Sequence, residues 1–126
     1  MYSAEPLFKS HYSLGKSVLT LSKAGESEPD EPSSVFDIAT KLSLSKVTLV
    51  EDSISGFLEA YKSSEAAKMS LRFGLRLTVC DSIDNKTAES RVREHKIVIF
   101  IKNTDGYTDL IKISTAACSE GFYYYP

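Results

Sequence analysis

The sequence predicts one α/β domain, in which strands and helices succeed one another along a chain of 126 residues. Three segments, at residues 35–42, 54–61 and 107–118, repeat apolar side chains at the helical spacing of three and four. Two others are typical of strands: residues 71–80 alternate large apolar side chains with smaller or polar ones, and residues 97–101 are apolar throughout. With two shorter strands, the predicted order is strand, helix, strand, helix, strand, strand, helix, with some parallel pairing.

Serine and aspartate residues mark where the first two helices are expected to begin. Ser33 or Ser34 can cap the first helix, which should end near Leu44 and be followed by a strand at residues 46–50. Asp52 or Ser53 can cap the second helix, which should run to about residue 69. The expected core-facing positions of these two helices are Val35, Ile38, Ala39, Leu42, Ile54, Phe57, Leu58 and Tyr61.

The two ends of the chain are less regular. Residues 7–12 can form a short strand, and the acidic, proline-containing residues 24–33 are expected to form an exposed loop. The later strand should cover residues 96–102, and Thr104 or Asp105 can cap the third helix. The expected face of this helix consists of Tyr107, Leu110, Ile111, Ser114 and Cys118.

Composition narrows the classes of function. A net charge of −2 gives no basic footprint, so direct nucleic-acid binding is not expected. The chain has no apolar run of membrane-spanning length and no visible secretory signal, so we expect a cytoplasmic protein without membrane contact, in a bacterium or a phage-infected host. Cys80 and Cys118 lack metal-type spacing and are expected to be buried free thiols.

The residue types alone predict no catalytic site and no cofactor. The two histidines, His11 and His95, lie in different segments, so a site that needs three histidines is impossible within the chain. Glu51 and Asp52 could hold Mg²⁺, but adjacent acids after a strand often cap or begin a helix, which is the role we expect. His11, Glu51 and Asp52 remain the candidates if a site survives.

Two other segments invite a binding role. Gly15-Lys16-Ser17 resembles the end of a P-loop, but Ser10 stands where the first glycine belongs, so we do not expect this loop to bind phosphate. The tyrosines at residues 123–125 could stack on bases, or they could pack in a core.

Four segments, taken together, resemble the PHP (polymerase and histidinol phosphatase) domain of bacterial DNA polymerase III alpha subunits. Residues 10–14, SHYSL, are similar to the end of the family's first motif, H-x-H-S/T-x-Y-S-L. Residues 47–61 resemble A-L-T-D-H-G-N-L-x-G-x-x-x-F-Y, and residues 67–79 resemble A-G-I-K-P-I-x-G-x-E-x-x-V. Residues 97–114, IVIFIKNTDGYTDLIKIS, resemble the following L-L-A-K-N-x-x-G-Y-x-N-L-x-K-L-S.

The resemblance implies a metal site whose ligands are mostly replaced in this chain. Leu7 and Lys9 stand for the two histidines of the first motif, and Arg76 stands for a later glutamate. Val50 and Glu51 stand for the Asp and His of the second motif, which leaves Glu51 as the one possible surviving ligand. Positive side chains where cations should bind disfavour metal by Coulomb repulsion.

The resemblance also implies a fold, namely part of a PHP-type distorted, TIM-like barrel with mostly parallel strands. Only the first four strands of that barrel are expected here, with residues 24–33 as an insertion. An incomplete barrel exposes a sheet edge, so we expect self-association or a protein partner to cover it. The expected contact segments are residues 7–12 and 96–102 and the C-terminal end, with Lys96, Val98, Phe100, Tyr123 and Tyr124 as candidate contacts.

Three functions follow from the sequence. The first is a non-catalytic PHP-like module of DNA replication, which holds a surface for replication proteins. The second is a stand-alone interaction protein, which a phage could encode, that binds a host factor. The third is a metal-dependent phosphoesterase with a displaced site. This chain alone is not expected to be an enzyme, although a longer parent chain could be a DNA-directed DNA polymerase.

Overall fold

The computed structural model describes residues 5–13, 15–79, 82 and 95–120. These residues form a mixed α/β structure with four strands and three helices, in the order that the sequence predicts. The elements are β1 (Leu7–Phe8), α1 (Val35–Lys41), β2 (Lys46–Glu51), α2 (Phe57–Ala66), β3 (Ser70–Val79), β4 (His95–Phe100) and α4 (Thr104–Glu120).

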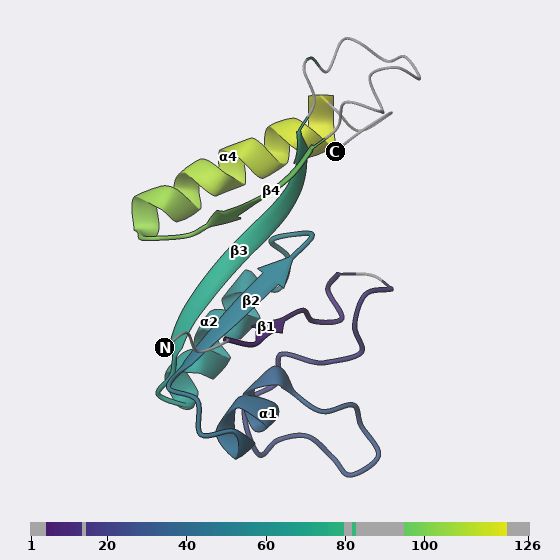
Figure 1. Cartoon of the computed structure of the whole chain (residues 1–126), viewed down its shortest axis with the longest axis vertical. Coiled ribbons are helices and arrows are strands. Elements are labelled where there is room, and N and C mark those ends of the chain that lie inside the picture. Colours follow the sequence, from purple (N-terminus) through teal and green to yellow (C-terminus); the bar gives the residue numbers. More distant parts are fainter. Residues whose placement is uncertain (1–4, 14, 80–81, 83–94, 121–126) are drawn as a thin grey trace.

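The four strands form one open sheet in the order β1-β2-β3-β4 (Figure 1). The pairs β1–β2 and β2–β3 are parallel, and the pair β3–β4 is antiparallel. The strand β3 has 10 residues, so different parts of it pair with its two neighbours. Its residues 70–75 pair with β2, and its residues 74–79 pair with β4. Among the described strands, β1 and β4 are therefore the two edges of the sheet.

The helix α1 begins as the sequence predicts and ends earlier. Ser34 is its N-cap, and the hydroxyl oxygen of Ser34 accepts a hydrogen bond of 3.1 Å from the amide of Phe36. The helix stops at Lys41 instead of near Leu44, because Ser43 takes a left-handed backbone conformation with φ of 55°.

The predicted start of α2 is wrong. The helix begins at Phe57 with Gly56 as N-cap, and neither Asp52 nor Ser53 caps it. Asp52 instead forms ion pairs with two basic side chains from other segments. Ala60, Ser63 and Ser64 are the buried positions of α2, so the predicted core face is also partly wrong. The predicted core positions Leu58 and Tyr61 are exposed to 59% and 46%.

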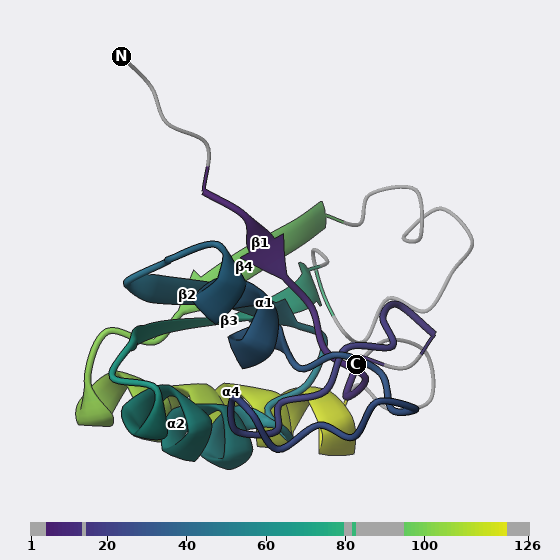
Figure 2. The same cartoon turned by 90° about the horizontal axis from the view of Figure 1, so that it is seen from below.

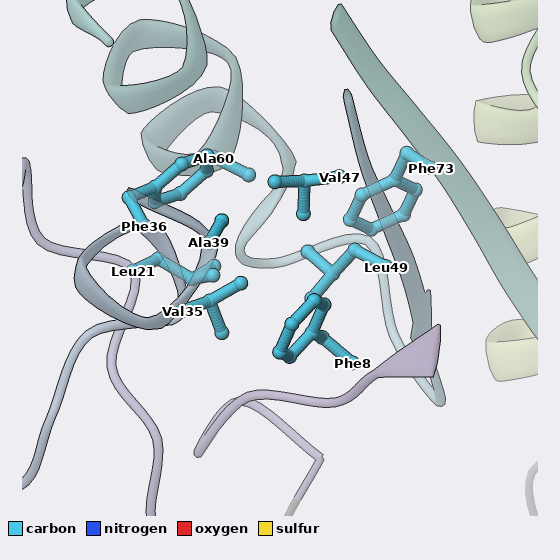
Figure 3. Packing of buried hydrophobic residues seen from close by; sticks show 9 residues of the cluster. All are labelled: Phe8, Leu21, Val35, Phe36, Ala39, Val47, Leu49, Ala60 and Phe73. Atoms are coloured by element: carbon cyan, nitrogen blue, oxygen red, sulfur yellow. The ribbon is translucent and has the colours of Figure 1, made fainter. Parts of the chain in front are cut away.

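The main core lies between the sheet, α1 and α2, and Figure 3 shows its side chains converging from these elements. The strands contribute alternate residues, because successive side chains of a strand point to opposite faces. The nine buried residues are Phe8, Leu21, Val35, Phe36, Ala39, Val47, Leu49, Ala60 and Phe73. Phe57 extends this core toward α4, since its ring meets Phe73 edge-on at 5.2 Å and stacks on Tyr107 at 4.4 Å.

The opposite face of the sheet, which we call the open face, has no described helix on it. Figure 2 shows α2 and α4 together on the other side. On β3, Gly74 points to the open face, where the side chains of Val98 and Phe100 lie against it. A Cβ atom at Gly74 would come within 2.8 Å of both. Further residues of this face, by strand alternation, are Leu7, Thr48, Val50, Arg72, Arg76, Thr78 and Lys96.

Several other predicted boundaries, one cap and the burial of one cysteine differ from the structure. The first strand is only Leu7–Phe8, shorter than residues 7–12, and β4 ends at Phe100 instead of residue 102. Asn103 precedes α4 and its side-chain oxygen accepts from the amide of Gly106 at 2.8 Å, so the cap is one residue earlier than Thr104. Cys118 is exposed, which contradicts the predicted burial, because only a narrow face of α4 is covered. Cys80, Tyr123 and Tyr124 lie outside the described residues.

No helix in the described parts of the chain combines the length and the apolar character that a membrane span requires. Residues 24–33 lie at the surface, and only Ser27 among them is partly covered.

Candidate functional site

Polar and charged side chains gather where the parallel strands end. The carboxyl ends of β1, β2 and β3 lie at the same edge of the sheet, because these strands are parallel. Lys9, Asp52 and Arg76 follow or lie near those ends, and antiparallel β4 starts there with His95 and Lys96. In open α/β sheets, ligands bind at this edge. The topology thus makes this cluster the candidate site.

Glu51, the last residue of β2, is a fully buried carboxylate at the centre of this edge. One carboxylate oxygen accepts from the backbone amide of Ser10. The other accepts from the hydroxyls of Ser10 at 3.1 Å and Ser13 at 2.8 Å. A buried charge is tolerated only when it is well paired or hydrogen-bonded, and these three donors meet that demand.

The donors come from a tightly turned loop after β1. The amide of Ser13 donates to the carbonyl of Ser10, and the amide of Lys16 donates to the carbonyl of Ser13, each at 3.0 Å. The hydroxyl of Ser13 also accepts from the amide of Asp52 at 2.9 Å. The buried carboxylate of Glu51 therefore fastens this loop to the end of β2, and we call its described residues 9–13, 15 and 16 the serine loop.

Asp52 lies at the outer side of this network and forms ion pairs with two cationic side chains. One carboxylate oxygen is 3.0 Å from Nε of Arg76 and 3.4 Å from Nζ of Lys9. All three side chains are between 23% and 35% exposed, so solvent screens these ion pairs in part. Through these ion pairs, Asp52 links the ends of β1 and β2 to β3. An acid that served as a second metal ligand would instead need a carboxylate without such partners.

The described residues at this edge offer a catalytic metal few free ligands. Mg²⁺ needs several oxygen ligands, and Zn²⁺ needs imidazole, thiolate or carboxylate groups with free lone pairs. The carboxylate of Glu51 is taken up by three donors, and that of Asp52 is neutralised by two cations. Nowhere in the described parts of the chain do three or more His, Cys, Asp or Glu side chains converge.

The positions that the sequence singles out are only partly brought together. Lys9, Glu51 and Arg76 lie in the cluster, whereas Leu7 is 67% exposed near the other end of β1 and Val50 is partly buried on the open face. His11 lies aside from the cluster, with Nδ1 at 3.2 Å from the carbonyl oxygen of Leu19. Its ring packs against that of Tyr12, with the centroids 4.4 Å apart.

Sequence reasoning missed Ser10 and Ser13 as partners of Glu51. One feature of the sequence could have indicated this role, namely two serines three residues apart after a strand. That spacing suits a turn in which both hydroxyls face the same acceptor. Sequence reasoning also missed a cavity of about 290 Å³ on the open face at this edge. The cavity is lined by Lys16, Asp52, Arg76, Leu77, Thr78 and Lys96.

Comparison with known proteins gives one family. The model of the family described as the PHP domain matches residues 9–126. Neither the curated proteins nor the solved structures gave a significant match to the chain. The family match covers the serine loop, both acids and Arg76, which is the whole candidate site.

Proposed function

Because the chain belongs to the PHP domain family, we propose that it is a non-catalytic PHP module related to that of the DNA polymerase III alpha subunit. In this proposal it acts in DNA replication as a scaffold that binds other proteins. The four described strands would be part of a PHP-type barrel, whose further wall comes from elsewhere in the chain or from a partner.

The observation that carries this proposal is the double ion pair on Asp52. Lys9 and Arg76 stand where the resemblance places metal ligands, and both bind the carboxylate that a metal would need. A divalent cation at this point would have to displace two fixed positive charges and would be repelled by them. Two cationic side chains at these positions, both paired with Asp52, support a module that works without a metal.

As a scaffold, the chain would bind its partners at the two edges of the described sheet. Edge strands present unpaired backbone groups that another chain can use as a template. On β4, Val98 and Phe100 are exposed to 40% and 49%, which places apolar surface beside that edge. A second copy of the chain, or a replication protein such as a polymerase subunit or a proofreading exonuclease, is the partner that we propose there.

Metal binding and hydrolysis test the proposal directly. The purified chain is titrated with Mn²⁺ and Zn²⁺ by calorimetry and assayed on a generic phosphodiester and phosphomonoester. We expect no stoichiometric metal and no turnover. Stoichiometric metal with turnover that is lost in Glu51→Gln or Asp52→Asn would overturn the proposal in favour of a displaced phosphoesterase site.

The partner is tested separately, with purified proteins. Sedimentation of the chain alone and with a DNA polymerase III alpha subunit or its exonuclease measures association. We expect either a self-associated form or a complex with one of these proteins. Val98→Glu, on the open face of β4, should weaken association. The control Ile113→Glu, on α4 at a similar exposure of 43%, should leave it unchanged. A monomer that binds neither protein would contradict the scaffold role.

A further inference from the structure

We propose that the cavity on the open face binds the phosphate group of a small molecule directly, through basic side chains in place of metal ions. The inference deepens the metal-free site proposed above and rests on it. The side chains assigned to the phosphate are Lys16, Arg76 and Lys96, with the hydroxyl of Thr78 as a further donor.

The described wall of the cavity is rich in positive charge. Among the residues that the structure describes, it contains three cationic side chains and one acidic side chain, Asp52. Asp52 is held between Lys9 and Arg76, so its charge is already compensated. Glu51, the other nearby acid, is fully buried and bound by the serine loop. An excess of positive charge thus faces the cavity, in a chain whose total charge is −2.

Arg76 is oriented so that the outer edge of its guanidinium is available to a ligand. Only Nε of its guanidinium donates to Asp52, at 3.0 Å. The two terminal nitrogens have no partner among the residues that the structure describes. A guanidinium fixed through Nε keeps the fork of its outer edge available, and that fork matches two oxygens of a phosphate. Fixing the side chain beforehand also reduces the entropy that binding costs.

A lysine and a threonine form a pair across β3 and β4 at the cavity. Lys96 and Thr78 are cross-strand partners, and Nζ of Lys96 donates to the hydroxyl oxygen of Thr78 at 3.1 Å. Since this hydroxyl accepts from the lysine, its own hydrogen points elsewhere and can be donated to an anion. The bond holds the ammonium group at the wall of the cavity, where two further donor hydrogens of Lys96 remain.

Lys16 reaches the cavity from the serine loop. Its loop is turned by Gly15, which has a φ of +73°, and is fastened by the bonds of Ser10 and Ser13 to Glu51. No acidic side chain in the described ranges forms a salt bridge with Lys16. The proposed binding does not depend on the resemblance of this segment to a P-loop. It uses the lysine side chain, whereas a P-loop binds phosphate with a nest of backbone amides.

The size of the cavity and the charge of the chain favour a small ligand over a nucleic acid. About 290 Å³ lies at the lower end of pocket volumes that hold small molecules. A nucleic-acid groove instead needs a basic track for several successive phosphates and aromatic platforms for the bases. Apart from the three basic residues, the part of the lining that the structure describes consists of Asp52, Leu77 and Thr78. Inorganic phosphate and a phosphomonoester share the chemistry that these groups recognise.

The test is a titration of the full chain with inorganic phosphate and with phenyl phosphate, in a chelating buffer at low ionic strength. Amide resonances are followed by nuclear magnetic resonance. We expect saturable shifts at residues 76–78 and 96. Arg76→Gln and Lys16→Gln should each weaken binding by on the order of tenfold, as the loss of one charge-assisted hydrogen bond does. A tighter complex with phenyl phosphate would identify a phosphomonoester as the ligand, and equal affinity would identify phosphate itself.

Arg72→Gln is the matched control. Arg72 lies on the same face of β3 and pairs with Glu5, so its loss removes the same charge outside the cavity. It should change affinity by less than about twofold. Lys16→Gln keeps the test decisive if Arg76→Gln does not fold, because Lys16 is exposed and without an ion pair in the described structure.

Several results would overturn the proposal. Equal losses in Arg72→Gln and Arg76→Gln would show a general charge effect. An oligodeoxythymidylate that binds more tightly than phenyl phosphate through the same residues would show a nucleic-acid site. Failure to bind phosphate with or without Mn²⁺ would defeat this inference alone, whereas phosphate binding only in the presence of Mn²⁺ would also defeat the metal-free function.

Discussion

The hydroxyl of Ser13 can be removed with little other change, and the effect tests whether Glu51 organises the site. This hydroxyl donates 2.8 Å to the buried carboxylate and accepts 2.9 Å from the amide of Asp52. Ser13 is 1% exposed and Glu51 is fully buried, so water cannot replace the lost donor without a rearrangement. Ser13→Ala should therefore destabilise the fold and loosen the serine loop.

The magnitude follows from the two bonds. A hydrogen bond to a buried charged group contributes about 1.5–3 kcal/mol, and its loss leaves Glu51 with the two donors of Ser10. The amide of Asp52 is only partly buried, so losing its acceptor adds about 1 kcal/mol or less. We expect Ser13→Ala to lower the free energy of unfolding by about 2–4 kcal/mol, a large part of the ~5–15 kcal/mol that stabilises an ordinary domain.

Urea unfolding at neutral pH measures this difference, with an unchanged denaturant slope as the sign that the unfolded state is unaltered. Ser45→Ala is the matched control, since Ser45 is exposed and its hydroxyl makes no hydrogen bond within the described structure. It should change stability by less than about 0.5 kcal/mol. A double-mutant cycle with Glu51→Gln should give a coupling of about 0.5–3 kcal/mol. Additive single effects, or a Ser13→Ala protein as stable as the control, would refute the role given to Glu51.

Two further predictions concern packing and pH. Gly74→Ala should destabilise by about 1–3 kcal/mol in urea unfolding, because its Cβ would lie 2.8 Å from side chains of β4. The control Gly106→Ala has room in α4 and should be neutral or stabilising. A hydrogen bond from the hydroxyl of Tyr12 to Glu59 raises the pKa of Tyr12, and partial burial adds to the effect. The folded protein therefore keeps this proton longer than the unfolded chain. Its stability advantage over Tyr12→Phe should be full below about pH 10 and shrink as pH rises further, and an advantage that grew with pH would contradict this sign.

Local signals in the sequence were enough to predict most elements of the fold. The alternation of residues 71–80 correctly gave β3, because a half-buried strand imposes its period of two on the side chains. The cap of α1 was predicted at Ser33 or Ser34, and it is Ser34, because the preference of serine for that position is a local property. The order of elements follows from such segments alone.

The errors arose where tertiary contacts decide. Asp52 had all the local features of a helix cap, yet its carboxylate pairs with Arg76 of β3 and with Lys9 of the serine loop. Leu58 matched the helical period of α2, but the start of that helix at Phe57 turns Leu58 to solvent. Period and propensity do not contain either fact.

The candidate site was only half predictable for the same reason. Lys9 and Arg76 could be singled out because the resemblance aligns them with ligand positions of the family's motifs. The serine loop could not, because two serines become partners of Glu51 only after β1 and β2 pair in parallel. The cavity beside Arg76 depends on Lys96, which reaches the site through the antiparallel return of β4.

The staggered pairing of β3 has a consequence for how the molecule opens. Its first half is held by β2, with α1 and α2 behind, whereas its second half is held by β4. The two partners share only Gly74 and Leu75 on β3. Units joined so narrowly can exchange amide hydrogens as separate cooperative blocks. The amides of β4 should thus exchange earlier than those of β2, and the wall of the cavity that carries Lys96 would then be the part able to swing open while the Glu51 network stays closed.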